Sequence, residues 1–132
     1  MIRVAEENFL YFNISALAFV GDAVYELHVR LNIARAGVIH GDHLHRISTQ
    51  YVRASAQAKA IKAMLPCLPE EEQQLVRRAR NKKIGVKPKN ADAMDYKWAT
   101  AFEALLGYYS MSGQTDRLDA AAAEAMRIIS TQ

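Results

Sequence analysis

Two acidic residues stand out because each lies in a helical stretch whose other residues are largely apolar. Asp22 lies in ALAFVGDAVYELHVR, residues 16–30, and Glu103 lies in TAFEALLGYY, residues 100–109. A carboxylate among apolar side chains is costly unless a cation or a polar partner compensates it. Carboxylate oxygens are ligands that Mg²⁺ prefers, and a bound metal ion can activate water for hydrolysis. The two acids therefore predict a metal or catalytic site.

Each of these acids is close to a glycine. Gly21 precedes Asp22, and Gly107 follows Glu103 by one helical turn. A glycine inside a helix costs roughly 1 kcal/mol relative to alanine, and it is useful where another backbone or a ligand must come close. The pattern favours one carboxylate pair at a rigid crossing of two helices. The alternative is that Asp22 and Glu26, four residues apart, are surface acids on a half-exposed helix.

The helix that carries Asp22 is predicted to begin with Asn13 or Ser15 as its cap and to stop at Gly37. Apolar residues recur along it at three- and four-residue spacing, which is the period of a buried helical stripe. The predicted stripe consists of Leu17, Val20, Val24, Leu27 and Leu31.

The rest of the chain also has helical patterns, and no stretch alternates with a period of two. We expect an alanine-rich helix from Asp42, its N-cap, to about Met64, followed by the helix breakers Pro66 and Pro69. Further helices are expected over 70–83, from about 92 to 112 with Gly113 as the stop, and from about 116 to 129 with Thr115 as the cap. Residues 84–91 are expected to form a loop. The predicted fold class is all-α: one compact helical domain over residues 1–132.

Composition limits the class of protein. Of the 132 residues, 51% are hydrophobic and 23% are charged, as in ordinary globular domains. The single cysteine, Cys67, excludes an internal disulfide and a structural zinc finger, and it favours a reducing compartment. His40, His43 and His45 are better explained by a solvated helix start than by a metal site. The N-terminal residues lack a secretory pattern, and no apolar run could span a membrane, so we expect a cytoplasmic protein.

Positive charge is concentrated in one region. Between residues 77 and 97 there are eight Lys and Arg residues against two Asp residues, although the net charge of the whole chain is only +3. Such a region is commonly a solvated surface, but it can also follow the phosphates of a nucleic acid.

LAFVGDAVYE, residues 17–26, and TAFEALLGYY, residues 100–109, resemble the two signatures of the ribonuclease III endonuclease domain. RRARNKKIGVKPKNAD, residues 77–92, followed by YKWATAFEALLGYY, is similar to the small bacterial branch of that family, Mini-ribonuclease III. The absence of a following double-stranded-RNA-binding domain is also similar to this branch. By position, the resemblance implies that Asp22 and Glu103 bind Mg²⁺ and are catalytic. Two further acids of the larger enzymes are replaced by Ala18 and Thr100.

The resemblance also implies roles for other residues. Phe19 matches an aromatic residue that reaches across the dimer in the larger family, or it is an ordinary core phenylalanine. Glu26 either supports the metal site from outside or is a surface glutamate. The residues expected to bind RNA are Arg77, Arg78, Arg80, Asn81, Lys82, Lys83, Lys87 and Lys89.

The function implied by the resemblance is that of a homodimeric, Mg²⁺-dependent endoribonuclease. It would cut double-stranded RNA to give 5′-phosphate and 3′-hydroxyl ends with a short 3′ overhang. The branch further implies maturation of the large-subunit (23S) ribosomal RNA precursor, assisted by a ribosomal protein. The main alternative is a catalytically inactive domain of the same fold that binds structured RNA, which the loss of acids at Ala18 and Thr100 would favour. A helical DNA-binding protein is a weaker alternative, because no recognition-helix turn stands out.

Overall fold

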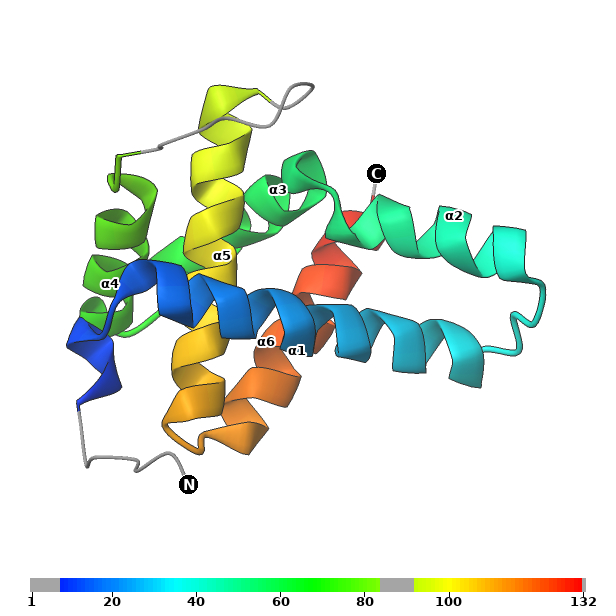
Figure 1. Ribbon diagram of the computed structural model, residues 1–132, viewed down its shortest axis with the longest axis horizontal. Coiled ribbons are helices and arrows are strands. Elements are labelled where there is room, and N and C mark those ends of the chain that lie inside the picture. The colour runs from blue at the N-terminus through cyan, green and yellow to red at the C-terminus, as the bar shows by residue number, and fades with distance from the viewer. Residues whose placement is uncertain (1–7, 84–91, 132) are drawn as a thin grey trace.

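The computed structural model describes residues 8–83 and 92–131, and within these ranges the chain is helical without any strand. The predicted all-α class is confirmed. The elements in order are η1 (Phe9–Tyr11), α1 (Ile14–Arg35), α2 (Gly41–Val52), α3 (Ala54–Met64), η2 (Leu65–Cys67), α4 (Glu70–Arg80), α5 (Ala93–Met111) and α6 (Thr115–Ser130) (Figure 1). None of the helices in the described residues is long and apolar enough to cross a membrane.

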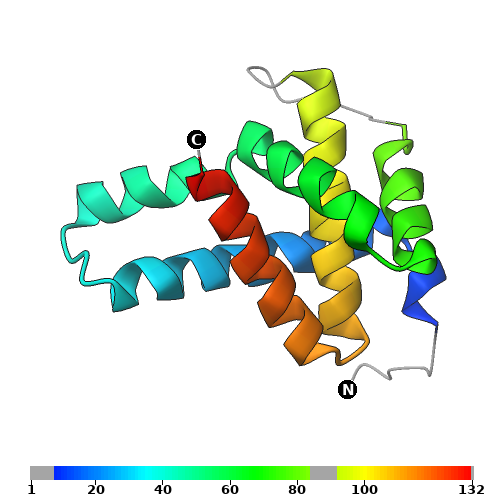
Figure 2. The ribbon, with the colours of Figure 1, turned by 180° about the vertical axis from the view of Figure 1, so that it is seen from behind.

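The centre of the fold is α5. It packs against α1, α3, α4 and α6, with α1 crossing one side of it and α3 and α6 lying on the other side (Figures 1 and 2). The large apolar residues on either side of Glu103 in α5 are fully buried: Phe102, Leu105, Leu106 and Tyr109. Because α5 is enclosed in this way, a polar residue on it is held in a fixed environment.

The predicted apolar stripe of α1 is wrong in its second half. Leu17 is buried, but Leu27 and Leu31 are 56% and 39% exposed. Gly21 and Tyr25 lie on the buried face instead, and Tyr25 packs edge-on against Phe102 of α5, with the ring centroids 4.8 Å apart. The contact with α5 therefore sets which face is buried. Beyond it, α1 runs out beside α2 as a two-helix arm (Figure 1).

The single helix predicted from Asp42 to Met64 is also wrong, because the chain breaks at Arg53, whose backbone is extended (φ −63°, ψ 153°). Side chains bind the carbonyl groups that the break frees at the end of α2. Tyr25 Oη donates to the Tyr51 carbonyl at 3.0 Å, and Gln57 Nε2 donates to the Val52 carbonyl at 2.8 Å. These tertiary hydrogen bonds replace helical ones at a place that has neither glycine nor proline.

The predicted helix ends are partly confirmed. Asn13 caps α1, since its side chain accepts from the amide of Ala16 at 2.9 Å. Gly37 and Gly113 follow α1 and α5 with φ values of 92° and 74°, which a residue with a side chain rarely adopts. Asp42 is not a cap but lies in the first turn of α2, whose N-cap is His40. Thr115 is the first residue of α6 rather than its cap. Neither Asp42 nor Thr115 is therefore the N-cap that the sequence predicted.

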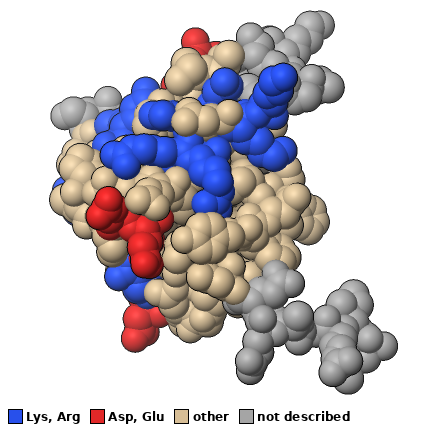
Figure 3. All heavy atoms as spheres, turned by 90° about the vertical axis from the view of Figure 1, so that its left-hand side faces the viewer, with Lys and Arg blue, Asp and Glu red and all other residues tan. Residues whose placement is uncertain are grey.

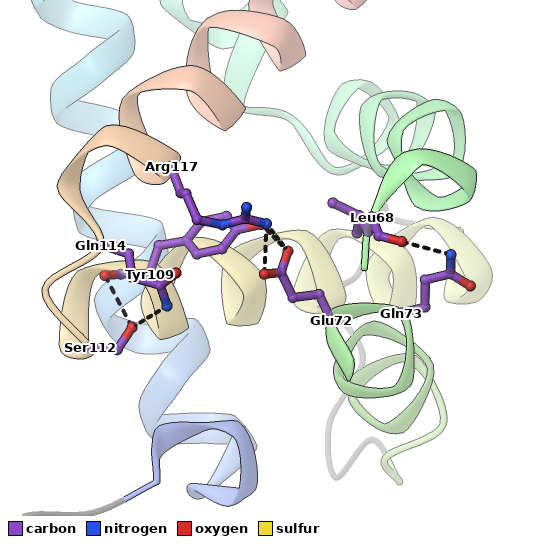
Figure 4. Close-up of polar contacts among 7 residues, drawn as sticks. All are labelled: Leu68, Glu72, Gln73, Tyr109, Ser112, Gln114 and Arg117. Carbon is purple, nitrogen blue, oxygen red and sulfur yellow. Dashed lines mark hydrogen bonds and ion pairs between the residues drawn. The ribbon is translucent and has the colours of Figure 1, made fainter. Parts of the chain in front are cut away.

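A buried polar cluster ties α4 to α5 and α6 (Figure 4). Glu72, in the first turn of α4, is only 6% exposed. It accepts hydrogen bonds from Tyr109 Oη and, at 2.5 and 2.6 Å, from the guanidinium of Arg117. Burial and the hydrogen bond to Glu72 raise the pKa of Tyr109 well above its ordinary value, so Tyr109 stays a hydrogen-bond donor. This cluster fixes the N-terminal end of α4 and thereby the direction in which its basic C-terminal end points.

Candidate active site

The helices α1 and α5 touch through their glycines. A Cβ atom added to Gly21 would lie 1.7 Å from the carbonyl oxygen of Glu103, and one added to Gly107 would lie 1.8 Å from the carbonyl oxygen of Leu17. Both distances are far inside van der Waals contact, so neither helix tolerates a side chain at the crossing. The predicted close crossing is confirmed, and it brings Asp22 on α1 beside Glu103 on α5.

The carboxyl groups of Asp22 and Glu103 interact directly. Glu103 is half-buried and Asp22 is exposed. Burial raises the pKa of Glu103 from its ordinary 4.5 to about 8, and the negative charge of Asp22 and a hydrogen bond between the two carboxyl groups contribute to the same rise. The side-chain amide of Gln57 opposes this rise by hydrogen bonding to the carboxylate. Two carboxylates this close share a proton, or they need a cation between them.

The pair fits a hard divalent cation. Both groups offer carboxylate oxygens, and their mutual repulsion is relieved when a positive charge lies between them. No group of three or more His, Cys, Asp and Glu side chains suited to a metal occurs among the described residues. Mg²⁺ keeps several waters and is bound through one or two carboxylates, so a two-carboxylate site suits it.

The two positions at which the resemblance implies further acids in larger enzymes do not supplement the pair. Ala18 has no oxygen ligand in its side chain. Thr100 is half-buried, and its hydroxyl donates to the Tyr96 carbonyl one turn earlier on the same helix at 3.0 Å. The acidic set at this crossing is therefore Asp22 and Glu103.

Gln57 of α3 is a residue of this site that sequence reasoning missed. It is only 2% exposed, and its side chain counters the rise in the pKa of Glu103. The signal was present, because Gln57 lies three residues after Ala54 and four before Ile61, which puts it on the same helical face as these apolar residues. A polar residue inside an apolar stripe indicates a site in the same way as the two acids do.

Glu26 lies one turn beyond Asp22 and is half-buried, so it is not a simple surface glutamate. One carboxylate oxygen is 3.4 Å from the guanidinium of Arg30. Its other oxygen, Oε2, is buried and has no hydrogen-bond partner among the described residues. A role of Glu26 in supporting the site stays a prediction.

The basic residues predicted to bind RNA lie at the C-terminal end of α4 and just beyond it. Lys and Arg side chains gather on the upper part of this side of the molecule, with acidic side chains below them (Figure 3). Arg77, Arg78, Lys82 and Lys83 are exposed, as is Asn81. Lys87 and Lys89 lie outside the described residues. On the surface of α5, Trp98 lies beneath two cations, the guanidinium of Arg80 at 4.9 Å and the ammonium of Lys62 at 5.7 Å from the ring centroid. Lys62 is a basic neighbour that the sequence did not single out.

One of these arginines has a structural contact. The guanidinium of Arg78 donates to the Leu10 carbonyl and lies 5.7 Å from the Tyr11 ring centroid. It therefore helps to hold η1 against α4. Arg77, Lys82 and Lys83 are the better candidates for contact with phosphates.

Phe19 is 81% exposed, so the interpretation as a core phenylalanine is wrong. It lies three residues before Asp22 on α1, and the large apolar residues Leu27 and Leu31 are exposed further along the same helix. A role of Phe19 in reaching across a dimer stays a prediction.

Comparisons with known proteins agree with this geometry. Residues 15–114 match the Ribonuclease III domain family. The chain is 44% identical over 113 residues to Mini-ribonuclease 3 of Brevibacillus brevis, which covers 86% of this chain and 84% of that protein. It is 47% identical over 106 residues to Mini-ribonuclease 3 of Desulfitobacterium hafniense, covering 80% and 67%. A crystal structure of a Fusobacterium nucleatum protein superimposes with a TM-score of 0.81 at 26% identity, over 92% of this chain and 98% of that one.

Proposed function

Since the chain belongs to the ribonuclease III family and is an endoribonuclease, we propose that it cuts double-stranded RNA with Mg²⁺ held by Asp22 and Glu103. The observation that carries this proposal is the glycine-to-glycine crossing, which holds the two carboxylates together at the surface of a rigid helix pair. The alternative of an inactive RNA-holding domain rests on Ala18 and Thr100. It is disfavoured because both remaining acids are present and adjacent.

Asp22 and Glu103 would hold the cation through their carboxylate oxygens. When bound, Mg²⁺ supplies positive charge to the attacked phosphate and lowers the pKa of a water molecule. In the proposed hydrolysis, water attacks phosphorus and the bond from phosphorus to the 3′ oxygen breaks, which leaves a 5′-phosphate and a 3′-hydroxyl. The close contact of α1 and α5 fixes the separation of the two carboxylates, so little reorganisation is needed during the reaction.

The basic surface at the end of α4 would bind the RNA backbone. Duplex RNA is recognised mostly by its shape and its phosphates, and exposed Lys and Arg side chains meet that need without reading bases. We propose the exposed Arg77, Lys82 and Lys83 as the main contacts, with Arg80 and Asn81 beside them. Lys87 and Lys89 are added from the sequence, and Arg78 contributes charge while it holds η1.

We further propose that the active form is a homodimer of this catalytic domain, residues 1–132, with Phe19 in the interface. A two-fold pair of chains presents two equivalent sites, and a duplex has two strands to cut. The exposure of Phe19 supports this proposal. Similarity to Mini-ribonuclease 3 supports the ends of the 23S ribosomal RNA precursor as the substrate, with a ribosomal protein assisting. Such a substrate would place the activity in the cytoplasm.

The test is cleavage of a plain RNA duplex by the purified protein. We expect cutting with Mg²⁺, none with a chelator, and none by Asp22→Asn, which removes a ligand charge while keeping the side-chain shape. Asp42→Asn is the matched control, because Asp42 is exposed in the first turn of α2. Binding without cutting by the wild-type protein would favour the inactive domain. Full activity of Asp22→Asn would rule out the assigned site.

A further inference from the structure

We infer that Lys62, Arg80 and Trp98 form a binding site for a phosphate of the RNA backbone. Three helices supply it: Lys62 lies in the last turn of α3, Arg80 ends α4, and Trp98 lies in the second turn of α5. This inference rests on the proposed function, because the ligand is the same RNA duplex. It adds a contact from α3, which the basic surface proposed at the end of α4 does not contain.

Trp98 brings the two cations together. Its side chain is half-buried and packs against the core. The guanidinium of Arg80 lies 4.9 Å from the ring centroid and the ammonium of Lys62 lies 5.7 Å from it. Both distances are in the range over which an aromatic ring attracts a cation. Since α3 and α4 both pack against α5 (Figures 1 and 2), the ring links one cation from each of them.

The charge at Trp98 is not neutralised by acids of the described residues. None of the four ion pairs found there includes Lys62 or Arg80. Asp92, at the start of α5, caps that helix by accepting from two backbone amides. The ring attracts each cation but does not cancel its charge, and the two positive charges repel each other. An anion that contacts both cations relieves this repulsion.

The other two cation–aromatic contacts in the described residues are different, because each cation there has a further partner. Arg117 lies 5.1 Å from the ring centroid of Tyr109 and is paired with Glu72 at 2.5 Å. Arg78 lies 5.7 Å from the ring centroid of Tyr11 and donates to a backbone carbonyl of η1. Both arginines therefore have a structural role that the cations at Trp98 lack.

The donors at Trp98 suit a phosphodiester. Arg80 donates from Nε to its neighbour Asn81 at 3.0 Å, and Lys62 is exposed. A guanidinium fork can donate to two phosphate oxygens, and a lysine ammonium adds a compact positive charge. Phosphates are the negative groups that a duplex presents along its whole length.

The site is also in the right place for the proposed duplex. The exposed basic residues at the end of α4 adjoin Arg80, and Lys and Arg side chains gather on this side of the molecule (Figure 3). Trp98 precedes Glu103 by five residues on α5, which is about 7.5 Å along the helix axis. One duplex held at the carboxylate pair can therefore reach both.

The competing explanation is structural. Cations at the C-terminal end of a helix are favoured by the helix dipole, and the stem of a lysine can cover an apolar ring. Lys59 separates the two explanations. It lies three residues before Lys62 on α3, is also exposed, and donates to the Thr131 carbonyl at 2.8 Å.

The experiment measures binding of a plain RNA duplex over a series of salt concentrations, in chelator so that metal-dependent cleavage does not occur. We expect Lys62→Gln to weaken binding by roughly 3- to 10-fold and to reduce the slope of log affinity against log salt by about one unit. Lys59→Gln is the matched control. It removes the same charge from the same helix and should keep the wild-type affinity and slope. In cleavage, Lys62→Gln should raise KM for the duplex and leave kcat unchanged.

Trp98→Leu tests the ring, because it keeps an apolar side chain and every charge. We expect it to weaken duplex binding in the otherwise wild-type protein, with no further loss in the Lys62→Gln/Arg80→Gln background. Such non-additivity is expected when the three residues act through one site. A ring with only a structural role would lower the urea midpoint of unfolding and leave duplex affinity unchanged.

Wild-type affinity and salt slope in Lys62→Gln would overturn the inference, as would a loss that Lys59→Gln matches. Lys62 is exposed, so this result decides the question even where Trp98→Leu does not fold. The two levels are distinguished by the wild-type protein. If it binds and cuts the duplex while Lys62→Gln binds equally well, only the site at Trp98 is excluded. If it neither binds nor cuts the duplex, the proposed function fails, and the site at Trp98 fails with it.

Discussion

Replacing Glu103 by glutamine is expected to stabilise the metal-free protein above neutral pH, although it should abolish cleavage. The reason is the environment of the carboxylate. Burial, followed by the charge of Asp22, raises the pKa of Glu103 from 4.5 to about 8. The folded state therefore holds this proton more tightly than the unfolded state does. Between about pH 4.5 and pH 8 the stability of the wild-type protein should fall as pH rises, because folding then requires a costly charged Glu103.

The size of the effect on the free energy of unfolding follows from the shift in the pKa of Glu103. One pKa unit corresponds to about 1.4 kcal/mol, so a rise from 4.5 to about 8 sets an upper limit of roughly 5 kcal/mol at pH 9. Glutamine is neutral but still polar, and burying its amide has its own cost. We therefore expect Glu103→Gln to gain about 1–3 kcal/mol in free energy of unfolding at pH 9 and little at pH 5.

The assay is urea unfolding followed by circular dichroism at pH 5, 6, 7, 8 and 9, in chelator. The control is Glu71→Gln, which changes an exposed glutamate in the first turn of α4 and should keep the wild-type dependence on pH. Addition of Mg²⁺ should stabilise the wild-type protein, since a ligand of the folded state shifts unfolding by mass action, and it should not stabilise Glu103→Gln to the same extent. A wild-type stability that is flat or rises from pH 5 to pH 8, with Glu103→Gln no more stable at pH 9, would refute the reasoning.

Three further sets of substitutions test the helix crossing, the basic surface and the dimer. Gly21→Ala should destabilise the protein by about 3 kcal/mol in the same urea assay, because the added Cβ would lie 1.7 Å from the Glu103 carbonyl oxygen. Gly41→Ala is the control, since a Cβ at Gly41 meets nothing within 4 Å. This control variant should be neutral or slightly stabilising. Changing Arg77, Lys82 and Lys83 to glutamine should weaken duplex binding and reduce the slope of log affinity against log salt by about one unit for each phosphate that is no longer neutralised. An unchanged slope in a filter-binding series would remove this surface from the interface. Phe19→Ala should shift the protein toward monomer in sedimentation velocity, and an unchanged dimer would exclude Phe19 from the interface.

The crossing of α1 and α5 was predictable because its signals are local. An acid beside Gly21 and an acid one turn before Gly107 are each unusual in an apolar helix, and a close backbone approach explains both. The all-α class followed from periodicity in the same way. Leu105 and Leu106 are buried as their spacing indicated, since α5 is covered by helices on several sides.

Other features depended on interactions that no local pattern contains. The break at Arg53 occurs without glycine or proline, because Tyr25 and Gln57 bind the freed carbonyls from elsewhere in the fold. Leu27 and Leu31 have helical spacing but lie off the buried face of α1, on which Val29 and Ile33 are buried instead, so spacing alone misplaced them. Gln57 was missed because an amide in an alanine-rich helix carries no charge, and only the folded structure shows that it is buried.

We propose that Asp22 and Glu103 act as one catalytic unit, and a double-mutant comparison of Mg²⁺-dependent duplex cleavage tests this most directly. The small residual rates of Asp22→Asn, Glu103→Gln and the double variant are measured in single turnover with saturating protein and long incubation. Residues that act as one unit are strongly non-additive, so the double variant should be no slower than the slower single variant. If the two losses multiply in the double variant, or if either single variant keeps the wild-type rate, the two carboxylates do not form one catalytic centre.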